Sequence, residues 1–321
     1  MTQRAANNVD VIEVPVSLHG FWPGFEIDEW AGAMAFMGDG LRWRLAEPGE
    51  RPRLAIVSVF ASEAGRWSAG GGAVPAGVTS LQFIGESRAP DLDRFDFAMS
   101  MSTLRDPRHL RWPLWCWNLR VADGSLAALQ RPASERAAHA AMVRARPGFC
   151  AFVVANRSAR ERLAMFRMLS AHRRVDAAGP VGRNVPPIAP GTLAKRAFLR
   201  GYRFALVYEN LAWPGYCTEK LAEALAAGCI PIYWGDPHAV RDFNPACFLR
   251  REDFASDEAL AQRVIELDTD EAAFMAMAAQ PCFVEDRVPE SLSDETARRF
   301  IQRVLVHAGV RGRDWHEGAK E

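Results

Sequence analysis

The chain of 321 residues contains almost no lysine: Lys195, Lys220 and Lys320 are the only lysines among its 39 cationic side chains. The 39 cations are matched by 39 aspartates and glutamates, so there is no excess of positive charge to bind a nucleic-acid backbone. Any anion-binding site must therefore be local. Each lysine in a chain that otherwise uses arginine is a candidate for such a site.

Paired cysteines and long apolar runs are also lacking. The six cysteines are far apart in sequence and include no CxxC pair, which favours small buried side chains over a zinc site or a disulfide framework. No apolar run reaches the roughly 18 residues that a membrane-spanning helix needs. The first residues lack the apolar core of a signal peptide. We therefore expect a cytoplasmic protein without a membrane span, associated with membranes at most peripherally.

Common cofactor and metal motifs give little support to other classes. The chain has neither a GxGxxG dinucleotide motif nor the GK[ST] of a P-loop. Two DxD triplets, at 91–93 and 268–270, have the pattern of metal-dependent sugar transferases. Neither triplet follows a convincing apolar strand of a nucleotide-binding domain, so we expect no metal ion and no cofactor.

Hydrophobic periodicity predicts alternating strands and helices. In the first half we expect a helix within 26–37 and strands at 11–18, 54–60, 81–84 and 95–99. In the second half we expect strands at 149–154, 204–208 and 229–234 and helices at 160–169, 218–227, 257–267, 271–279 and 295–310. Strand–helix–strand repetition indicates an α/β fold with parallel sheets.

The two α/β halves are similar in length, which predicts two Rossmann-like domains facing each other across a cleft. We expect an N-terminal domain over 1–147, with a C-terminal helix at 293–311 packing back on it, and a C-terminal domain over 148–292. The stretch 120–148 is rich in alanine and arginine, and we interpret it as the connection between the domains.

The stretch 204–221, FALVYENLAWPGYCTEKL, is the most informative of the chain. A buried strand ends at Glu209-Asn210, and a helix begins near Thr218, a suitable N-cap. Ligands of open α/β sheets bind at such strand ends, where helix N-termini favour phosphate. Lys220 opposes the helix dipole in the first turn, which hints at a function; an exposed surface lysine is the alternative. Glu219 could accept hydrogen bonds from a ribose, or could be an ordinary first-turn acid.

These residues have a specific resemblance. The run Tyr-Glu-Asn, then Tyr216-x-Thr-Glu-Lys-Leu, then Ala-Gly-Cys-Ile-Pro-Ile-Tyr-Trp-Gly resembles the donor-binding signature of the α-1,3-fucosyltransferases, glycosyltransferase family 10. The continuation at 242–254 is similar to the bacterial enzymes that build Lewis-type antigens. The resemblance is strong over 149–255, moderate over 83–117 and weak before residue 80.

The resemblance implies a GT-B fold whose C-terminal domain binds GDP-fucose. The residues that would bind this donor are Arg162, Glu209, Asn210, Tyr216, Thr218, Glu219 and Lys220. Arg162 and Lys220 would hold the diphosphate and Glu219 the ribose. Asn210 and Tyr216 would contact the nucleotide or the sugar. Because Arg157 and Arg160 lie beside Arg162, either could be the phosphate ligand instead.

The resemblance further implies an inverting transfer of L-fucose to a hydroxyl of a glycan acceptor, O3 of GlcNAc in the family's usual form. Glu86 would be the general base that takes the hydroxyl proton, and arginine and lysine would replace a metal ion. Leu211 stands where relatives have a small hydroxyl residue, which leaves the acceptor open. The alternatives are a same-fold transferase that uses another GDP-sugar or an unusual acceptor, and a non-catalytic glycan- or nucleotide-binding module. Three tryptophans at 112, 115 and 117 could stack on a sugar, although core packing is the preferred interpretation.

Overall fold

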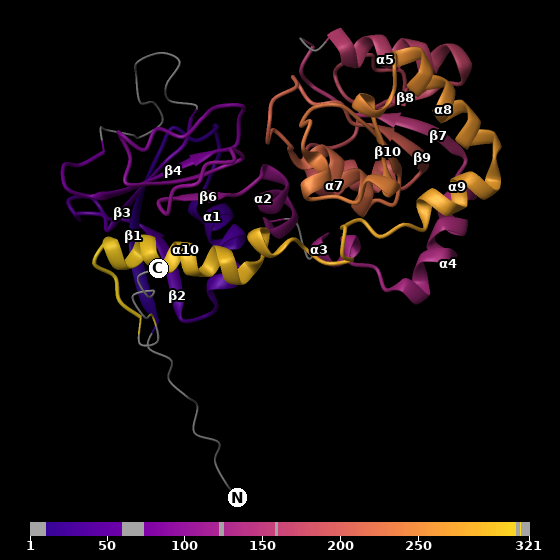
Figure 1. Ribbon diagram of the computed structural model, residues 1–321. Coiled ribbons are helices and arrows are strands. Elements are labelled where there is room, and N and C mark those ends of the chain that lie inside the picture. The colour runs from indigo at the N-terminus through magenta and orange to yellow at the C-terminus, as the bar shows by residue number, and fades with distance from the viewer. Residues whose placement is uncertain (1–10, 60–73, 122–124, 158–159, 313–314, 316–321) are drawn as a thin grey trace, which may run out of the picture. The chain divides into compact units, whose positions relative to one another are not determined.

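The computed structural model describes residues 11–59, 74–121, 125–157, 160–312 and 315, which form two compact α/β units (Figure 1). The first unit comprises the described residues up to Ser100, Leu104–Trp112 and the described residues from Ser291. The second unit comprises Met101–Thr103 and Pro113–Glu290. Residues 1–10, on which the signal-peptide argument rests, lie outside the described part.

The first unit is built on a six-stranded parallel sheet with the order β2-β1-β3-β4-β5-β6. Its strands are β1 (Ile12–His19), β2 (Leu41–Leu45), β3 (Leu54–Val57), β4 (Thr79–Ile84), β5 (Phe97–Ser100) and β6 (His109–Arg111). The sequence analysis did not predict β2 and β6. In β2 only Trp43 is buried, and Arg44 pairs with Glu13 of β1, so this edge strand lacks an apolar run.

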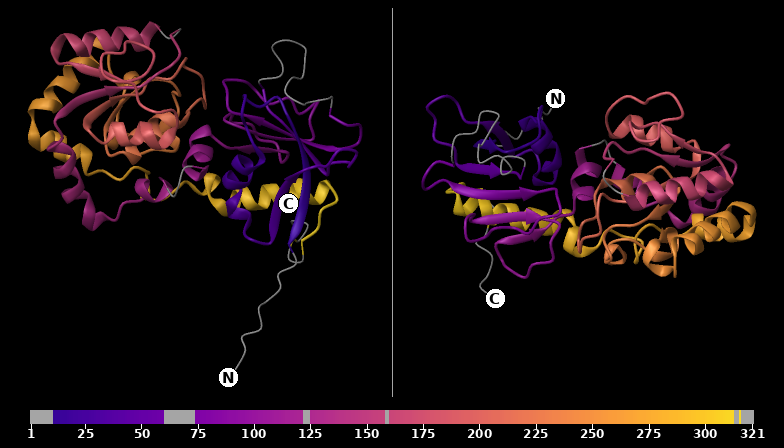
Figure 2. Two further views of the ribbon diagram at one scale, coloured as in Figure 1. Left: turned by 180° about the vertical axis from the view of Figure 1, so that it is seen from behind. Right: turned by 90° about the horizontal axis from the view of Figure 1, so that it is seen from above.

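Helix α10 (Asp294–His307) packs on the first unit, together with α1 (Ile27–Ala33) and the short helix η1 (Ala35–Met37) (Figure 2). Ser293 caps α10 by accepting a hydrogen bond from the amide of Thr296 at 3.1 Å. One face of α10 is buried, and its Phe300 contacts Phe97 of β5 edge-on. The guanidinium of Arg298 donates to the carbonyl of Phe36 at 2.7 and 2.9 Å. Burial of this amphipathic face fixes α10 on the first unit.

The second unit has a five-stranded parallel sheet with the order β11-β10-β9-β7-β8. Its strands are β7 (Gly148–Phe152), β8 (Val175–Ala177), β9 (Tyr202–Leu206), β10 (Ile230–Tyr233) and β11 (Leu249–Arg250). Counted along the chain within this unit, the order is 2-1-3-4-5, so the connections leave β7 and β9 in opposite directions. The place between β7 and β9 where the direction of the connections reverses is called the switch point, and open sheets of this kind bind ligands there. Two units with parallel sheets confirm the predicted α/β fold.

The helices of the second unit include three that precede β7. The α-helices are α2 (Leu114–Val121), α3 (Ser125–Leu129), α4 (Ala133–Arg144), α5 (Arg160–His172), α6 (Thr192–Leu199), α7 (Glu219–Ala226), α8 (Asp257–Thr269) and α9 (Glu271–Ala278). Short turns of 3-10 helix are η2 (Ala239–Arg241), η3 (Pro245–Cys247), η4 (Arg251–Asp253) and η5 (Glu290–Leu292). Among the described residues no helix is both long and apolar enough to cross a membrane.

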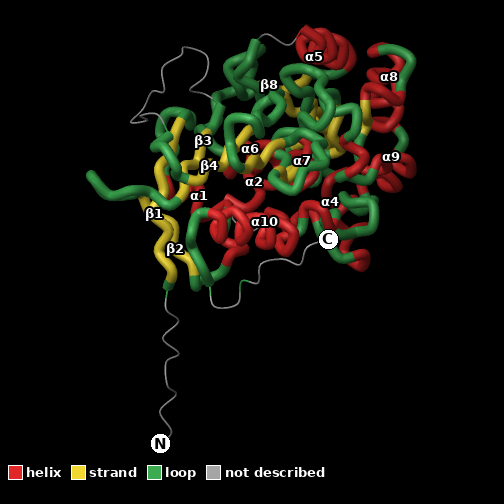
Figure 3. Tube along the Cα trace, turned by 60° about the vertical axis from the view of Figure 1, so that its left-hand side comes forward, coloured by secondary structure: helices red, strands yellow, loops and turns green. Residues whose placement is uncertain are grey.

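The stretch 120–148, expected to be a connection, contains the helices α3 and α4. Helix α4 lies beside α9 and buries Ala140 and Val143, while α2 packs against α7 (Figure 3). Alanine is the strongest helix former, so its abundance here favoured helix over linker. We expected the boundary between the domains at residue 147, whereas in the structure the chain passes from the first unit to the second within residues 100–113.

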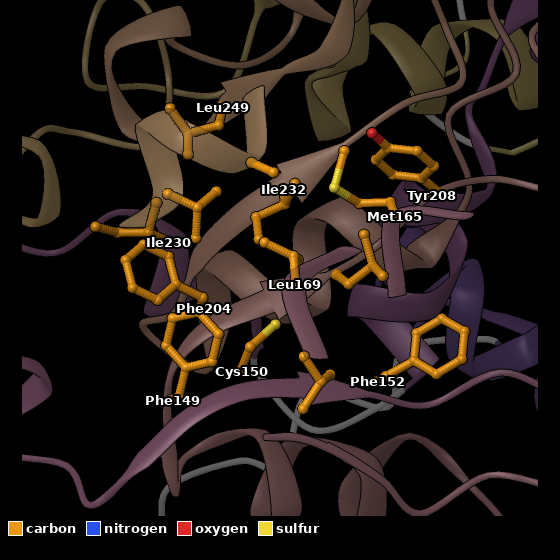
Figure 4. Close-up of a cluster of buried hydrophobic side chains, with 14 of the residues drawn as sticks. Phe149, Cys150, Phe152, Met165, Leu169, Phe204, Tyr208, Ile230, Ile232 and Leu249 are labelled. Carbon is orange, nitrogen blue, oxygen red and sulfur yellow. The ribbon is translucent and has the colours of Figure 1, made fainter. Parts of the chain in front are cut away.

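The core of the second unit is formed where β7 and β9 lie between helices (Figure 4). Phe149 and Phe152 of β7, Phe204 of β9 and Leu169 of α5 belong to this cluster and are almost inaccessible to solvent. All six cysteines are free thiols and five of them are buried, as expected for small core side chains. A parallel sheet covered on both faces explains why its central strands are apolar runs.

The second DxD triplet has a structural role. The carboxylate of Asp268 is 4% exposed and accepts hydrogen bonds from Nε of buried Arg203 at 2.9 Å and from Nη1 of Arg173 at 3.0 Å. Asp270 caps α9 by accepting a hydrogen bond from the amide of Ala273 at 2.9 Å. Both carboxylates therefore stabilise the fold.

We predict that Asp268→Asn lowers the free energy of unfolding of the second unit by about 3 to 5 kcal/mol, because it leaves the buried Arg203 guanidinium without its counter-charge. Urea denaturation measures this change. The matched control is Asp253→Asn, which removes a partly exposed pair with Arg250 and should cost less than about 1 kcal/mol. Equal losses in the two variants would contradict the importance given to the buried pair.

Candidate functional site

The site begins at the switch point of the second sheet, where residues 153–156 follow β7 and residues 207–210 follow β9. Arg162 of α5 joins these two strand ends. Its Nε and Nη2 donate to the carbonyl of Tyr208 at 3.0 and 2.7 Å, and its Nη1 donates to the carbonyl of Asn156 at 3.2 Å. Its Nη2 also donates to Oδ1 of Asn210 at 2.9 Å. One side chain thus holds both loops at the point where ligands of this sheet type bind.

The charge of Arg162 is held by neutral oxygens. The residue is 1% exposed, and its hydrogen-bond acceptors in the described chain are two carbonyls and an amide. Burial lowers the pKa of the guanidinium, and the nearby charge of Glu209 opposes this effect. Because arginine remains charged at any accessible pH, a buried cation without a carboxylate acceptor favours an anionic ligand.

The two neighbouring arginines are placed differently. Arg157 and Arg160 are both exposed, and Arg157 donates to the carbonyl of Pro180 at 3.5 Å. Of the three arginines considered as anion ligands, Arg162 alone lies between the two strand ends. The geometry therefore favours Arg162 for that role.

Glu209, at the end of β9, organises the start of α7. Its carboxylate is fully buried, accepts the amide of Thr218 at 2.8 Å, lies 2.7 Å from the Thr218 hydroxyl and lies 2.9 Å from Nζ of Lys220. Thr218 is the N-cap residue by backbone position, but its hydroxyl contacts Glu209 and makes no side-chain capping bond. Burial opposes the charge of Lys220, but Glu209 and Glu219 outweigh it and raise its pKa. Lys220 is thus a permanent cation, and Glu209 explains why a lysine is tolerated in this first turn.

A second lysine joins the site, which the sequence analysis did not assign. Nζ of Lys195, on α6, lies 2.6 Å from Oε2 of Glu223 and 3.5 Å from Oε1 of Glu219. Burial would raise the pKa of Glu219, but the charges of Lys220 and Lys195 outweigh burial and lower it. Two of the three lysines of the chain therefore flank one carboxylate. The scarcity of lysine was the signal that pointed to Lys195.

A pocket of about 490 Å³ opens beside these groups. Its wall consists of residues 153–155 after β7, 178–180 after β8 and the start of α6, with Lys195, Glu219 and Glu223 on one side. The volume is typical of small-molecule sites. The pocket combines backbone groups at the strand ends with the ionised carboxylate of Glu219. Backbone groups can hydrogen-bond to a polar ring, and a carboxylate can accept from the two hydroxyls of a diol.

Asn210 and Tyr216 bracket the loop between β9 and α7. Asn210 accepts from Arg162 through Oδ1, and its Nδ2 donates to the hydroxyl of Tyr216 at 3.4 Å. Tyr216 is 2% exposed. The amide of Gly215 donates to Oδ1 of the buried Asp236 at 2.7 Å, which holds this loop to the end of β10. These contacts bring together all the residues expected to bind the donor, Arg162, Glu209, Asn210, Tyr216, Thr218, Glu219 and Lys220.

Glu86 belongs to the first unit and follows β4 directly. It is half-buried, two residues beyond Ile84 at the carboxyl end of that strand. The neighbouring carboxylates have structural partners: Asp96 accepts the amide and hydroxyl of Ser80 at 2.8 Å each, and Asp91 accepts the amide of Arg94 at 3.2 Å. Asp96 and Asp91 thus hold the backbone of this stretch, and Glu86 follows the strand end directly.

The three tryptophans considered as a sugar platform belong to the core. Trp112, Trp115 and Trp117 are 1, 0 and 3% exposed. Trp115 donates from Nε1 to Asp242 at 3.3 Å. Within the described residues no three His, Cys, Asp or Glu side chains come together as metal ligands.

We predict that Arg162→Ala lowers the free energy of unfolding of the second unit by about 2 to 4 kcal/mol, because the buried carbonyl of Tyr208 loses its donors. The control is Arg160→Ala, two residues away on the same helix and exposed, which should change stability by less than about 0.5 kcal/mol. Thermal unfolding followed by circular dichroism compares the two. A stable Arg162→Ala variant would mean that the bridge between the strand ends is not needed for folding.

Comparisons with known proteins identify similar sequences. Residues 143–278 match the model of glycosyltransferase family 10 (fucosyltransferase), C-terminal part. The alpha-(1,3)-fucosyltransferase FucT of Helicobacter pylori is 31% identical over 219 residues, which cover 61% of this chain and 45% of that protein. A 4-galactosyl-N-acetylglucosaminide 3-alpha-L-fucosyltransferase of Homo sapiens is 32% identical over 186 residues, covering 51% and 50%. The chain spans about half the length of these curated relatives.

Solved structures of the same kind share the fold. A crystal structure of an alpha1,3-fucosyltransferase with GDP matches with a TM-score of 0.74 and 21% identity, covering 99% of this chain and 96% of that one. The structure with GDP-fucose matches with a TM-score of 0.72 and 22% identity over the same shares. The fold is thus of the GT-B type, with two parallel-sheet α/β units.

Proposed function

We propose that the chain is an inverting α-1,3-fucosyltransferase, because its residues 143–278 match the model of glycosyltransferase family 10. It transfers L-fucose from GDP-fucose to a hydroxyl of a glycan, and the specific acceptor hydroxyl that we propose is O3 of GlcNAc. The second unit binds the donor, and the first unit offers the acceptor. The observation that carries the proposal is the buried Arg162 guanidinium, which lies at the switch point without a carboxylate acceptor in the described chain.

The donor roles follow from the chemistry of each group. The pocket beside β7 and β8 takes the nucleoside, and the ionised Glu219 accepts hydrogen bonds from the ribose diol. Arg162 and Lys220 bind the diphosphate. The ammonium of Lys220 has three donors: two go to Glu209 and Thr218, and the third faces Oε1 of Glu219 at 3.5 Å, a long contact that a phosphate oxygen would share or replace. Charge-assisted bonds of this kind contribute about 1.5 to 3 kcal/mol each.

The transfer requires one base and no acid. The acceptor oxygen forms a bond to the anomeric carbon of fucose while the bond from that carbon to the β-phosphate oxygen breaks on the opposite face. The proton of the acceptor hydroxyl passes to Glu86. GDP leaves with the bonding electron pair, and Arg162 and Lys220 stabilise the charge that develops on it, a task that a metal ion performs in other transferases.

Two alternatives are separated by experiment. A same-fold enzyme for another GDP-sugar would turn over GDP-mannose in preference to GDP-fucose. A non-catalytic glycan- or nucleotide-binding module would bind GDP but transfer no sugar. The presence of Glu86 together with Arg162 and Lys220 favours an enzyme, because a module needs no base.

We predict that GDP raises the Tm of the protein in the presence of EDTA, because side-chain cations replace a metal ion. GDP at about a hundred times its Kd adds about 2.7 kcal/mol of stability. Lys220→Met, which keeps the stem and removes the charge, should weaken GDP binding by about tenfold or more in calorimetric titration. Lys220→Arg is the control that keeps the charge. A thermal shift abolished by EDTA would mean that a metal ion takes part.

We predict that Glu86→Gln lowers kcat for transfer by about 10² or more while GDP affinity stays the same, since glutamine keeps the size of the side chain but cannot take a proton. Initial rates with GDP-fucose and a panel of glycan acceptors measure this. Asp93→Asn, an exposed carboxylate of the same unit, is the control and should keep wild-type turnover. Near-normal kcat in Glu86→Gln would move the base to another residue.

A further inference from the structure

The loop between β9 and α7 exposes an uninterrupted apolar run. All four residues at 211–214, Leu-Ala-Trp-Pro, are exposed; Leu211 is 38% and Trp213 is 41% accessible. Among the described tryptophans, Trp213 is the only exposed one. Four consecutive exposed apolar residues are unfavourable on a soluble surface unless they bind something. The run 211–214 contains no charged side chain, so it offers a charged partner no electrostatic attraction.

The exposed run is presented on a rigid turn. The amide of Tyr216 donates to the carbonyl of Trp213 at 2.9 Å, which closes a β-turn over 213–216. Pro214 occupies the second position and Gly215, with φ of 92°, the third, as a type II turn requires. A Cβ at Gly215 would lie 2.3 Å from the carbonyl of Met101, and Asp236 holds the Gly215 amide. Trp213 therefore extends from a backbone that is fixed before any ligand arrives, which lowers the entropic cost of binding.

The turn is anchored to the donor-binding residues at both ends. Asn210 is hydrogen-bonded to Arg162 and to Tyr216. Trp213 is three residues from Asn210 and three residues from Tyr216, so its Cα is at most about 11 Å from the Cα atoms of both. Whatever covers the indole therefore lies at the margin of the donor site, where the acceptor of a transferase must be.

We propose that Trp213, with Leu211 beside it, binds the acceptor glycan by stacking on the C–H face of one of its sugar rings. The inference rests on the proposed function and adds to it one group of the second unit that contacts the acceptor. A pyranose ring offers a neutral face of polarised C–H groups, which suits the electron-rich face of an indole, while the indole N–H can donate to a ring hydroxyl. The sequence analysis considered the tryptophans at 112, 115 and 117 for this role, but all three are buried.

The test compares four proteins: wild type, Trp213→Ala, Trp213→Phe and, as a matched control, Met142→Ala. Met142 is 57% exposed on α4 of the same unit and far along the chain from the loop. KM is measured for the disaccharide galactosyl-β1,4-N-acetylglucosamine and for GDP-fucose, and the Kd of GDP is measured by calorimetry. We expect Trp213→Ala to raise the KM of the disaccharide by about tenfold and leave both donor constants unchanged. Trp213→Phe, which keeps a ring, should recover most of the loss, and Met142→Ala should match the wild type.

Two results overturn the inference while leaving the proposed function intact. One is an unchanged disaccharide KM in Trp213→Ala, and the other is an equal loss of GDP affinity, which would make the turn a support of the donor site. Absence of transfer by the wild-type protein would instead overturn the proposed function. In that case saturation-transfer NMR with the same disaccharide on the GDP complex decides: binding that Trp213→Ala abolishes supports the glycan surface, and no binding overturns it.

Discussion

The second unit depends on the buried guanidinium of Arg162. In the sheet of this unit, the chain leaves β7 and β9 in opposite directions, so the loops that follow the two strands diverge. Without a bridging group, the carbonyls of these loops would lack hydrogen-bond donors. Arg162 bridges the loops by donating to the carbonyls of Asn156 and Tyr208 and to the side chain of Asn210. The same side chain holds the strand ends together and is the cation that we propose binds the diphosphate, so the proposal links structural stability and anion binding in one residue.

Charge alternates along the groups that extend from this point. Lys220 lies between Glu209 and Glu219, and Lys195 lies between Glu219 and Glu223. Each buried carboxylate is stabilised by a lysine, and Glu219 by two, which keeps it ionised. Lysine suits this arrangement because its compact ammonium can contact two carboxylates at once. A chain that uses arginine nearly everywhere else has two of its three lysines here.

The division of the chain into units follows burial rather than sequence order. Helices α2, α3 and α4 precede β7 but belong to the second unit, where α2 packs on α7 and α4 packs on α9. Helix α10 follows the second sheet but buries its apolar face on the first unit. A cut at residue 147 would therefore separate these three helices from the unit on which they pack. Composition could not reveal this, because an alanine-rich amphipathic helix shows that it has an apolar face but not which sheet that face contacts.

The sequence by itself determined the α/β class and the main strands and helices, because local periodicity depends on neighbours along the chain. Its resemblance to a known family, and not periodicity, singled out the residues at 209–220 that we propose bind the donor. The sequence also marked the lysines by their scarcity. Tertiary structure alone placed Arg162 between the strand ends and left Arg157 and Arg160 exposed. It also assigned Glu209 as the partner of Lys220 and buried the tryptophans at 112, 115 and 117 while leaving Trp213 exposed. These outcomes depend on which segments meet after folding: the Arg162 side chain of α5 contacts the residues that follow β7 and β9, and burial of a side chain is decided by residues distant in sequence.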